Sequence, residues 1–251
     1  MKPLVLPPPA FNVVWLGQVD STNLLMQRRL EAWEGSGRMA ETLLVAGRQL
    51  AGRGRGSRSW ESPEGGLYAT WFGWVEVEVL GTVPLAAAVA LAEALEALVG
   101  GVIVGVKWPN DLMVEGRKLG GVLSQARVCG GLAGVIVGFG ANLAVTPPVT
   151  TGGRPPTSAA EWGWRGNATD AAVSTAVDCV TRLCTYLKKP TVARVAWEAR
   201  SVHRLGDELC VRAGDGFARG RFAGFGEAGQ LRLAMDGSEQ EFFAADLIAT
   251  L

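Results

Sequence analysis

The chain has 251 residues, 48% of them hydrophobic and 19% charged, and its 24 lysines and arginines balance 24 aspartates and glutamates. A net charge of zero argues against a protein whose whole surface attracts nucleic acid or anionic lipid. The single histidine, His203, excludes a histidine-rich metal site. Four cysteines without CxxC spacing are typical of a reduced protein. We expect a cytoplasmic protein, since residues 1–9 lack a signal peptide and Glu93 and Glu96 interrupt the longest apolar run.

Apolar and β-branched runs predict strands, and apolar residues at helical spacing predict helices, so the fold class is expected to be α+β. The predicted strands cover residues 11–17, 42–46, 67–74, 102–108, 112–114, 122–126 and 132–139. A first helix is expected after the capping residues 20–23, and two more at 84–99 and 172–187. Residues 145–156 are rich in proline, threonine and glycine and predict a surface loop.

A different pattern begins at Gly206. Short alternating segments at 208–212, 217–225, 230–236 and 239–243 are separated by glycine-rich turns, which predicts a small all-β barrel. We therefore expect two domains, residues 1–202 and residues 203–251.

The segment 48–58 concentrates charge, because Arg48, Arg53, Arg55 and Arg58 have no acidic residue among them. Glycines interleaved with arginines allow close backbone approach and supply forked donors for carboxylate or phosphate. One hypothesis is a loop that closes over a small polyanion. The alternatives are a solvated basic loop and an RNA contact.

A second group of polar residues lies at the end of the predicted strand 102–108. Lys107 is near the end of this strand, Asn110 and Asp111 follow it, and a predicted hairpin brings Lys118 back to the same edge. Lys118 could neutralise charge on a phosphoryl or acyl-phosphate transition state, and Asp111 could hold Mg²⁺ or orient an amine. The alternative is a hairpin turn with ordinary surface charges.

Two further positions have two interpretations each, and a third has one. Residues 20–23, with Ser21, Thr22 and Asn23, form either a helix cap or a binding site for a neutral polar ligand. Asn142 is either a turn residue or a base or ribose contact. His203 lies away from every motif in the sequence and is expected to be structural.

The order of these motifs resembles the biotin protein ligases, also called biotin–[acetyl-CoA-carboxylase] ligases. Asp-Ser-Thr-Asn is followed by Gln-x-Ala-Gly-Arg-Gly-Arg with a later Trp, then Lys-Trp-Pro-Asn-Asp, Arg-Lys-Leu-Gly-Gly and Gly-x-Gly-x-Asn. The resemblance is to the short form, without the N-terminal DNA-binding domain. It implies a class II synthetase-like catalytic domain, in which a mixed sheet packs with helices, and a C-terminal SH3-like β-barrel.

The resemblance implies a two-step reaction. Biotin and MgATP give biotinyl-5′-adenylate and pyrophosphate, and the biotinyl group then passes to one lysine of a biotin carboxyl carrier protein. It implies no nucleic-acid or membrane partner and is compatible with a monomer or a homodimer.

The resemblance also assigns roles to residues. Lys118, Arg53 and Asp111 match catalytic positions, and Asp111 is the candidate metal ligand. The positions that match biotin-binding residues are Ser21, Thr22, Asn23, Gln49, Gly52, Arg53, Gly54, Arg55, Lys118 and Gly120. The positions that match ATP-binding residues are Arg53, Arg55, Arg58, Trp60, Asn110, Asp111, Lys118 and Asn142.

The chain departs from the family pattern at three places. Leu50 stands where a polar residue is usual, Gly56-Ser57 replaces the common Arg-Gly, and Ser124-Gln125 stands where Val-Glu is common. These departures bear on the rigidity of the loop. Our hypothesis is that a looser loop releases adenylate and labels lysines less selectively.

Two alternative functions are considered. A lipoate or octanoate ligase or transferase shares the lysine but would need a long apolar tunnel. A non-catalytic RNA-binding module would use the arginine loop, although zero net charge and the lack of an aromatic-interleaved basic stripe weaken this interpretation.

Overall fold

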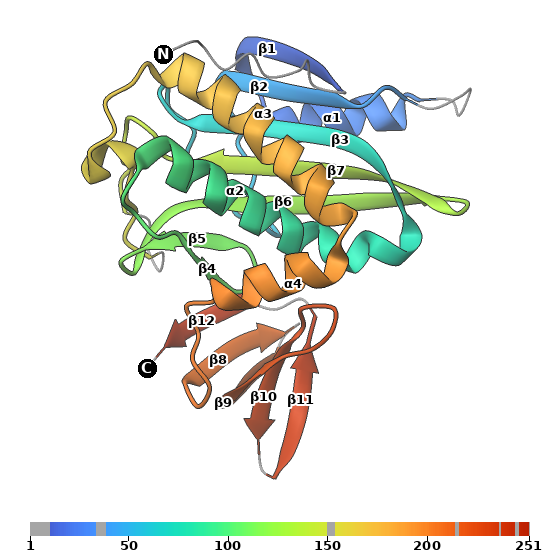
Figure 1. Cartoon of the computed structure of the whole chain (residues 1–251), viewed down its shortest axis with the longest axis vertical. Coiled ribbons are helices and arrows are strands. Elements are labelled where there is room, and N and C mark those ends of the chain that lie inside the picture. Colours follow the sequence, from blue (N-terminus) through green and yellow to red (C-terminus); the bar gives the residue numbers. More distant parts are fainter. Residues whose placement is uncertain are drawn as a thin grey trace.

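A seven-stranded mixed sheet forms the centre of the protein (Figure 1). In the computed structural model, the described residues are 11–33, 39–149, 154–213, 216–235, 237–243 and 246–250, so residues 1–9 and part of the loop predicted at 145–156 lie outside them. The strand order is β1-β2-β3-β7-β6-β5-β4, and only β1 and β2 are parallel. The strands are β1 Asn12–Val19, β2 Thr42–Gln49, β3 Leu67–Glu76, β4 Gly105–Lys107, β5 Asp111–Val114, β6 Arg117–Cys129 and β7 Leu132–Ala141.

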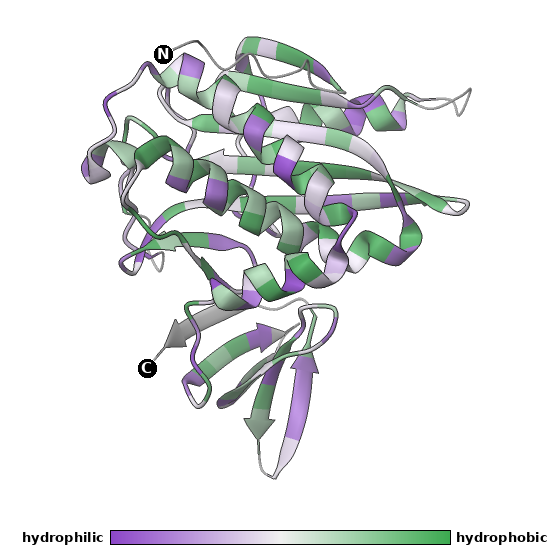
Figure 2. Ribbon diagram, viewed as in Figure 1, coloured by the Kyte–Doolittle hydropathy of each residue, from purple (hydrophilic) through white to green (hydrophobic). Residues whose placement is uncertain are grey.

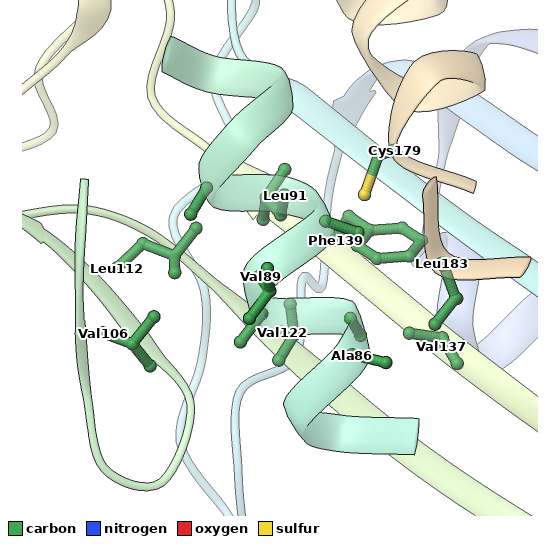
Figure 3. Packing of buried hydrophobic residues seen from close by; sticks show 14 of the residues in the cluster. Ala86, Val89, Leu91, Val106, Leu112, Val122, Val137, Phe139, Cys179 and Leu183 are labelled. Atoms are coloured by element: carbon green, nitrogen blue, oxygen red, sulfur yellow. The ribbon is translucent and has the colours of Figure 1, made fainter. Parts of the chain in front are cut away.

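Helices cover both faces of this sheet, which confirms the predicted mixed sheet packed with helices. On one face lie α2 (Val83–Val99) and α3 (Ala168–Leu187), with the short 3₁₀ helices η1 (Val77–Thr82) and η2 (Ala159–Trp162) nearby. Figure 3 shows Val89 and Leu91 of α2 packed among side chains from the sheet and from α3. The other face carries α1 (Thr22–Glu31), whose Met26 and Leu30 pack on Leu44, Phe72 and Ile136.

The apolar composition of α2 follows from its position between the sheet and α3, and Figure 2 shows it as largely hydrophobic. The segment Val77–Val99 is long and apolar enough to span a membrane, with a mean hydropathy of 1.7, but 61% of that window is buried inside the protein. Burial on this scale is what a central core helix requires.

A helix that the sequence interpretation missed, α4 (Pro190–Ala199), connects the main sheet to a second sheet. The strands β8 (Glu208–Ala213), β9 (Gly216–Phe225), β10 (Leu231–Met235), β11 (Ser238–Phe242) and β12 (Asp246–Thr250) form an antiparallel sheet of order β11-β10-β9-β8-β12. In the described part of the chain its outer strands β11 and β12 do not pair. The structure thus gives an open sheet, and a closed barrel stays a prediction.

Candidate active site

A cavity of about 540 Å³ opens where β2, β5, β6 and β7 bring polar residues together. That volume lies in the range of ligand pockets, roughly 300–1,000 Å³. All but two of the predicted site residues line it, although they come from segments more than a hundred residues apart. The lining residues among them are Ser21, Thr22, Asn23, Gln49, Arg53, Gly54, Arg55, Arg58, Trp60, Asn110, Asp111, Lys118 and Asn142.

The start of α1 forms one side of the cavity. Ser21 is the N-cap, and its hydroxyl accepts from the Leu24 N–H at 3.4 Å. The Thr22 N–H donates to Gln49 Oε1 at 2.8 Å, and the Thr22 hydroxyl accepts from the Thr70 hydroxyl at 2.8 Å. Capping and pocket lining are therefore combined in the same residues, so the two interpretations of residues 20–23 do not exclude each other.

Gln49 joins the two segments that border this side of the cavity. Its Oε1 accepts from the N–H and the hydroxyl of Thr22, and its Nε2 donates to Ser62 Oγ at 2.9 Å. The Ser62 hydroxyl in turn donates to the Trp60 carbonyl at 2.9 Å. Gln49 thus fixes α1 relative to the arginine-rich loop.

Two buried donors in the cavity wall have no hydrogen-bond partner among the described residues. They are Asn23 Nδ2 and Trp60 Nε1. The Asn23 carbonyl oxygen is already used, because it accepts from Gln27 Nε2 at 3.0 Å. An unsatisfied buried donor costs about 1–3 kcal/mol, so both atoms favour a ligand that brings acceptors.

Lys118 lies at the centre of the charged side. Its Nζ is 2.6 Å from Asp111 Oδ1 and 5.1 Å from the centroid of the Trp60 ring. Its backbone is held by the Pro155 carbonyl at 2.8 Å and by the Thr157 N–H, which donates to the Lys118 carbonyl at 2.9 Å. The predicted hairpin therefore does bring Lys118 back to Asp111, and it holds the ammonium group at the cavity.

The two predicted residues that do not line the cavity, Gly52 and Gly120, act by close packing. A Cβ on Gly52 would collide with the Trp60 carbonyl and Ser62 Oγ, and a Cβ on Gly120 would lie 2.6 Å from the Gly140 carbonyl. These glycines permit backbone segments to approach behind the site. Neither glycine lines the cavity, and their predicted contact with biotin stays a prediction.

The arginine-rich loop folds back on itself as a small hairpin. Arg53 and Ser59 form an isolated antiparallel bridge, and the Gly54 N–H donates to the Arg58 carbonyl at 2.8 Å. Gly56 has a φ of 61°, a left-handed conformation that favours glycine over the arginine common in the family. Leu50 is 60% exposed at the base of this hairpin.

Asn142 lines the cavity and also supports its frame. Its Nδ2 donates to the Thr157 carbonyl at 2.9 Å, and only 3% of the residue is exposed. Both interpretations of Asn142 thus remain open, as a structural residue and as a contact to the ligand.

Several lining residues were not assigned to the site from the sequence. Lys107 is 9% exposed, and burial lowers the pKa of its ammonium group while Asp111 opposes that shift. Tyr68 and Thr70 come from β3, and Arg154 lies within the proline-rich segment 145–156. The sequence signal for Lys107 was its place in Lys-Trp-Pro-Asn-Asp; the other three belong to no motif that was singled out.

The expectation that His203 lies away from every motif is wrong in space. His203 Nε2 accepts from the Trp108 N–H at 3.2 Å, directly before the turn that carries Asn110 and Asp111. Burial, followed by the charge of Lys107, lowers the pKa of this imidazole to about 4. The imidazole is therefore neutral at pH 7 and available as an acceptor.

Comparisons with known proteins indicate one family. A profile described as the Biotin/lipoate A/B protein ligase family matches residues 16–142. The chain is 32% identical over 245 residues to the biotin–[acetyl-CoA-carboxylase] ligase of Paracoccus denitrificans, which spans 92% of this chain and 98% of that protein. It is 37% identical over 139 residues to the bifunctional ligase/repressor BirA of Escherichia coli. This match covers 53% of this chain and 41% of that relative. A solved structure, the biotin protein ligase from Aquifex aeolicus in complex with biotin and ATP, matches with a TM-score of 0.72 at 28% identity, covering 94% and 97% of the two chains.

Proposed function

Since the chain belongs to the biotin/lipoate A/B protein ligase family, we propose that it activates biotin with ATP and transfers the biotinyl group to a lysine of a biotin carboxyl carrier protein. The main observation in support of this function is that residues predicted to bind biotin and residues predicted to bind ATP line one and the same cavity. The identity to a biotin–[acetyl-CoA-carboxylase] ligase over nearly the whole of both chains supports it.

In the first step a biotin carboxylate oxygen attacks the α-phosphorus of ATP, and pyrophosphate leaves. Two anions must meet, so cations at the point of attack lower the barrier. Lys118 would supply such a cation, and its hydrogen-bonded backbone and the Asp111 carboxylate beside its ammonium group support this role. Arg53 and Arg55, which line the same cavity from the arginine-rich hairpin, would screen the phosphates.

We assign the biotin head to the side formed by Thr22, Asn23 and Gln49, and the nucleotide to the side formed by Trp60, Asn110 and Asp111. The ureido group of biotin is neutral, and hydroxyl and amide groups match it. The unpartnered Asn23 Nδ2 supports this assignment because it can donate to a carbonyl oxygen.

The donor set fits a magnesium ion that is held mainly by phosphate. The described residues contain no group of three metal-binding side chains. Magnesium commonly takes only one or two carboxylates beside phosphate oxygens and water. Asp111 would be its protein ligand, and the bound ion would neutralise charge on the phosphates.

In the second step the ε-amine of the acceptor lysine attacks the acyl carbon of the adenylate, the amine loses a proton and AMP leaves. A mixed anhydride hydrolyses readily, so exclusion of water by the arginine-rich hairpin protects it. We further propose that residues 203–251 form an SH3-like domain beside a catalytic domain of residues 1–202, in a protein that acts in the cytoplasm.

Thermal unfolding with ligands tests this function. A ligand that binds only the native state raises the melting temperature. We expect biotin to raise it and biotin with ATP to raise it further, because the adenylate fills both parts of the cavity. Lipoate in place of biotin serves as the control. Absence of a shift with biotin, alone and with ATP, would contradict the proposal.

A further inference from the structure

The segment that leads into the second sheet runs along the edge of the first. It pairs with β4, the last strand of the main sheet, through an isolated parallel bridge between Val106 and Ser201. The Val106 N–H donates to the Arg200 carbonyl at 2.7 Å, and the Val202 N–H donates to the Val106 carbonyl at 3.0 Å. This connecting segment is therefore bonded to the strand that ends at the site.

His203 makes the next bond in this series with its side chain instead of its backbone. Its Nε2 accepts from the Trp108 N–H at 3.2 Å, so Nδ1 of the neutral ring carries the proton. The residue is 8% exposed, and its ring lies 5.8 Å from that of Phe222 in β9. The imidazole is thus fixed by packing against the second sheet.

Trp108 is also held from the second sheet through its indole. Its Nε1 donates to the Gly229 carbonyl at 3.0 Å, and the residue is 2% exposed. Both donors of Trp108 are consequently used by residues beyond α4. Asn110 and Asp111 follow within three positions, and Asn110 Nδ2 donates to the Val122 carbonyl at 2.6 Å.

We propose that His203 is a positioning residue for the nucleotide side of the site, which it orients through the backbone of Trp108. Loss of its acceptor leaves a buried N–H unsatisfied one residue before the turn, and that turn carries Asn110 and Asp111. The biotin side is built from α1, β2 and β3, whereas within the described part of the chain His203 bonds only to Trp108 and Ser201. The inference rests on the assignment of Asn110 and Asp111 to ATP.

Three substitutions in the full-length chain separate this role from a structural one. In His203→Gln the amide oxygen can reach the position of Nε2 and accept the same bond. In His203→Asn the shorter side chain cannot reach it, and in His203→Leu there is no acceptor. Leu205→Ala, at a residue that is 77% exposed, is the matched control in the same segment.

The assay is biotin-dependent exchange between pyrophosphate and ATP, with KM measured for each substrate, beside hydrogen exchange of the Trp108 amide. We expect His203→Leu and His203→Asn to lower kcat/KM for ATP by about 10-fold and to speed exchange of the Trp108 amide, with the affinity for biotin unchanged. His203→Gln should stay within about threefold of the unmodified chain, since its hydrogen bond is restored.

The outcomes distinguish the inference from the function on which it rests. No exchange activity in the unmodified chain would refute the function, whereas the Trp108 amide would still report the bond. An active chain in which all three variants behave alike would overturn the positioning role. An equal loss of kcat/KM for ATP and for biotin would also overturn the positioning role, because it would indicate general destabilisation. If His203→Leu does not fold, the comparison of His203→Gln with His203→Asn decides.

Discussion

Gly140→Ala tests the packing that supports the nucleotide side of the cavity. A Cβ at this position would lie 2.9 Å from Cε2 and 3.0 Å from Nε1 of Trp60, so the indole ring must move. The Trp60 backbone is held, because its N–H donates to the Gly52 carbonyl and its carbonyl accepts from the Ser62 hydroxyl, so the displacement must come from rotation of the ring. Its movement would also separate it from the Lys118 ammonium group.

Overpacking of this kind costs about 1–3 kcal/mol. Loss of the contact between the Trp60 ring and the Lys118 ammonium group adds about 0.5–1 kcal/mol. If the overpacking cost falls on the ATP-bound state, it corresponds to roughly 5- to 160-fold weaker ATP binding. Biotin affinity should change little, because its proposed side is formed by α1 and Gln49.

The affinities for ATP and for biotin are measured by isothermal titration calorimetry, and the stability is measured by thermal unfolding. Gly131→Ala is the control, since a Cβ on Gly131 meets no atom within 4 Å in the turn before the same strand. A Gly140→Ala protein with unchanged stability and unchanged affinity for ATP would refute the reasoning that Trp60 is held by this glycine.

Three further predictions concern the cavity and its surroundings. Lys118→Ala and Arg53→Ala should each abolish adenylate formation, measured by pyrophosphate exchange, while stability changes by roughly 1 kcal/mol or less; exchange at the unmodified rate would contradict the site assignment. Arg28 lowers the pKa of Asp20 from its ordinary 3.8 to about 2, so this exposed pair contributes stability above pH 3.8 that is lost as the pH falls through 2. In Arg28→Gln the pKa of Asp20 should return toward 3.8 in a carboxyl NMR titration, and a midpoint still near 2 would refute this cause. Incubated with biotin and ATP but no carrier, the chain should label bystander protein if the loop is loose, whereas strict dependence on carrier would count against that hypothesis.

The sequence predicted most strands and the gathering of the site, because both depend on local patterns. The apolar run at 132–139 predicted β7, the capping residues 20–23 predicted α1, and the predicted hairpin brought Lys118 back toward Asp111. The helix α4 was not predicted, although Pro190 stands at its start, where a missing N–H costs nothing.

Residues whose role depends on distant contacts could not be predicted. His203 follows no pattern, and its bond to Trp108 spans 95 positions. Gly52 and Gly120 have the motif positions of binding residues, and the motifs did not indicate that each glycine also admits a neighbouring backbone. Closure of the second sheet was likewise beyond the alternating pattern, which predicts strands and turns but not whether the outer strands meet.

Activation of biotin in this cavity is measured most directly by the exchange of pyrophosphate into ATP. We expect exchange that requires biotin and magnesium, that does not require the carrier protein, and that lipoate does not support. Exchange supported by lipoate and not by biotin would show that the cavity does not activate biotin, and so would the absence of exchange with either acid.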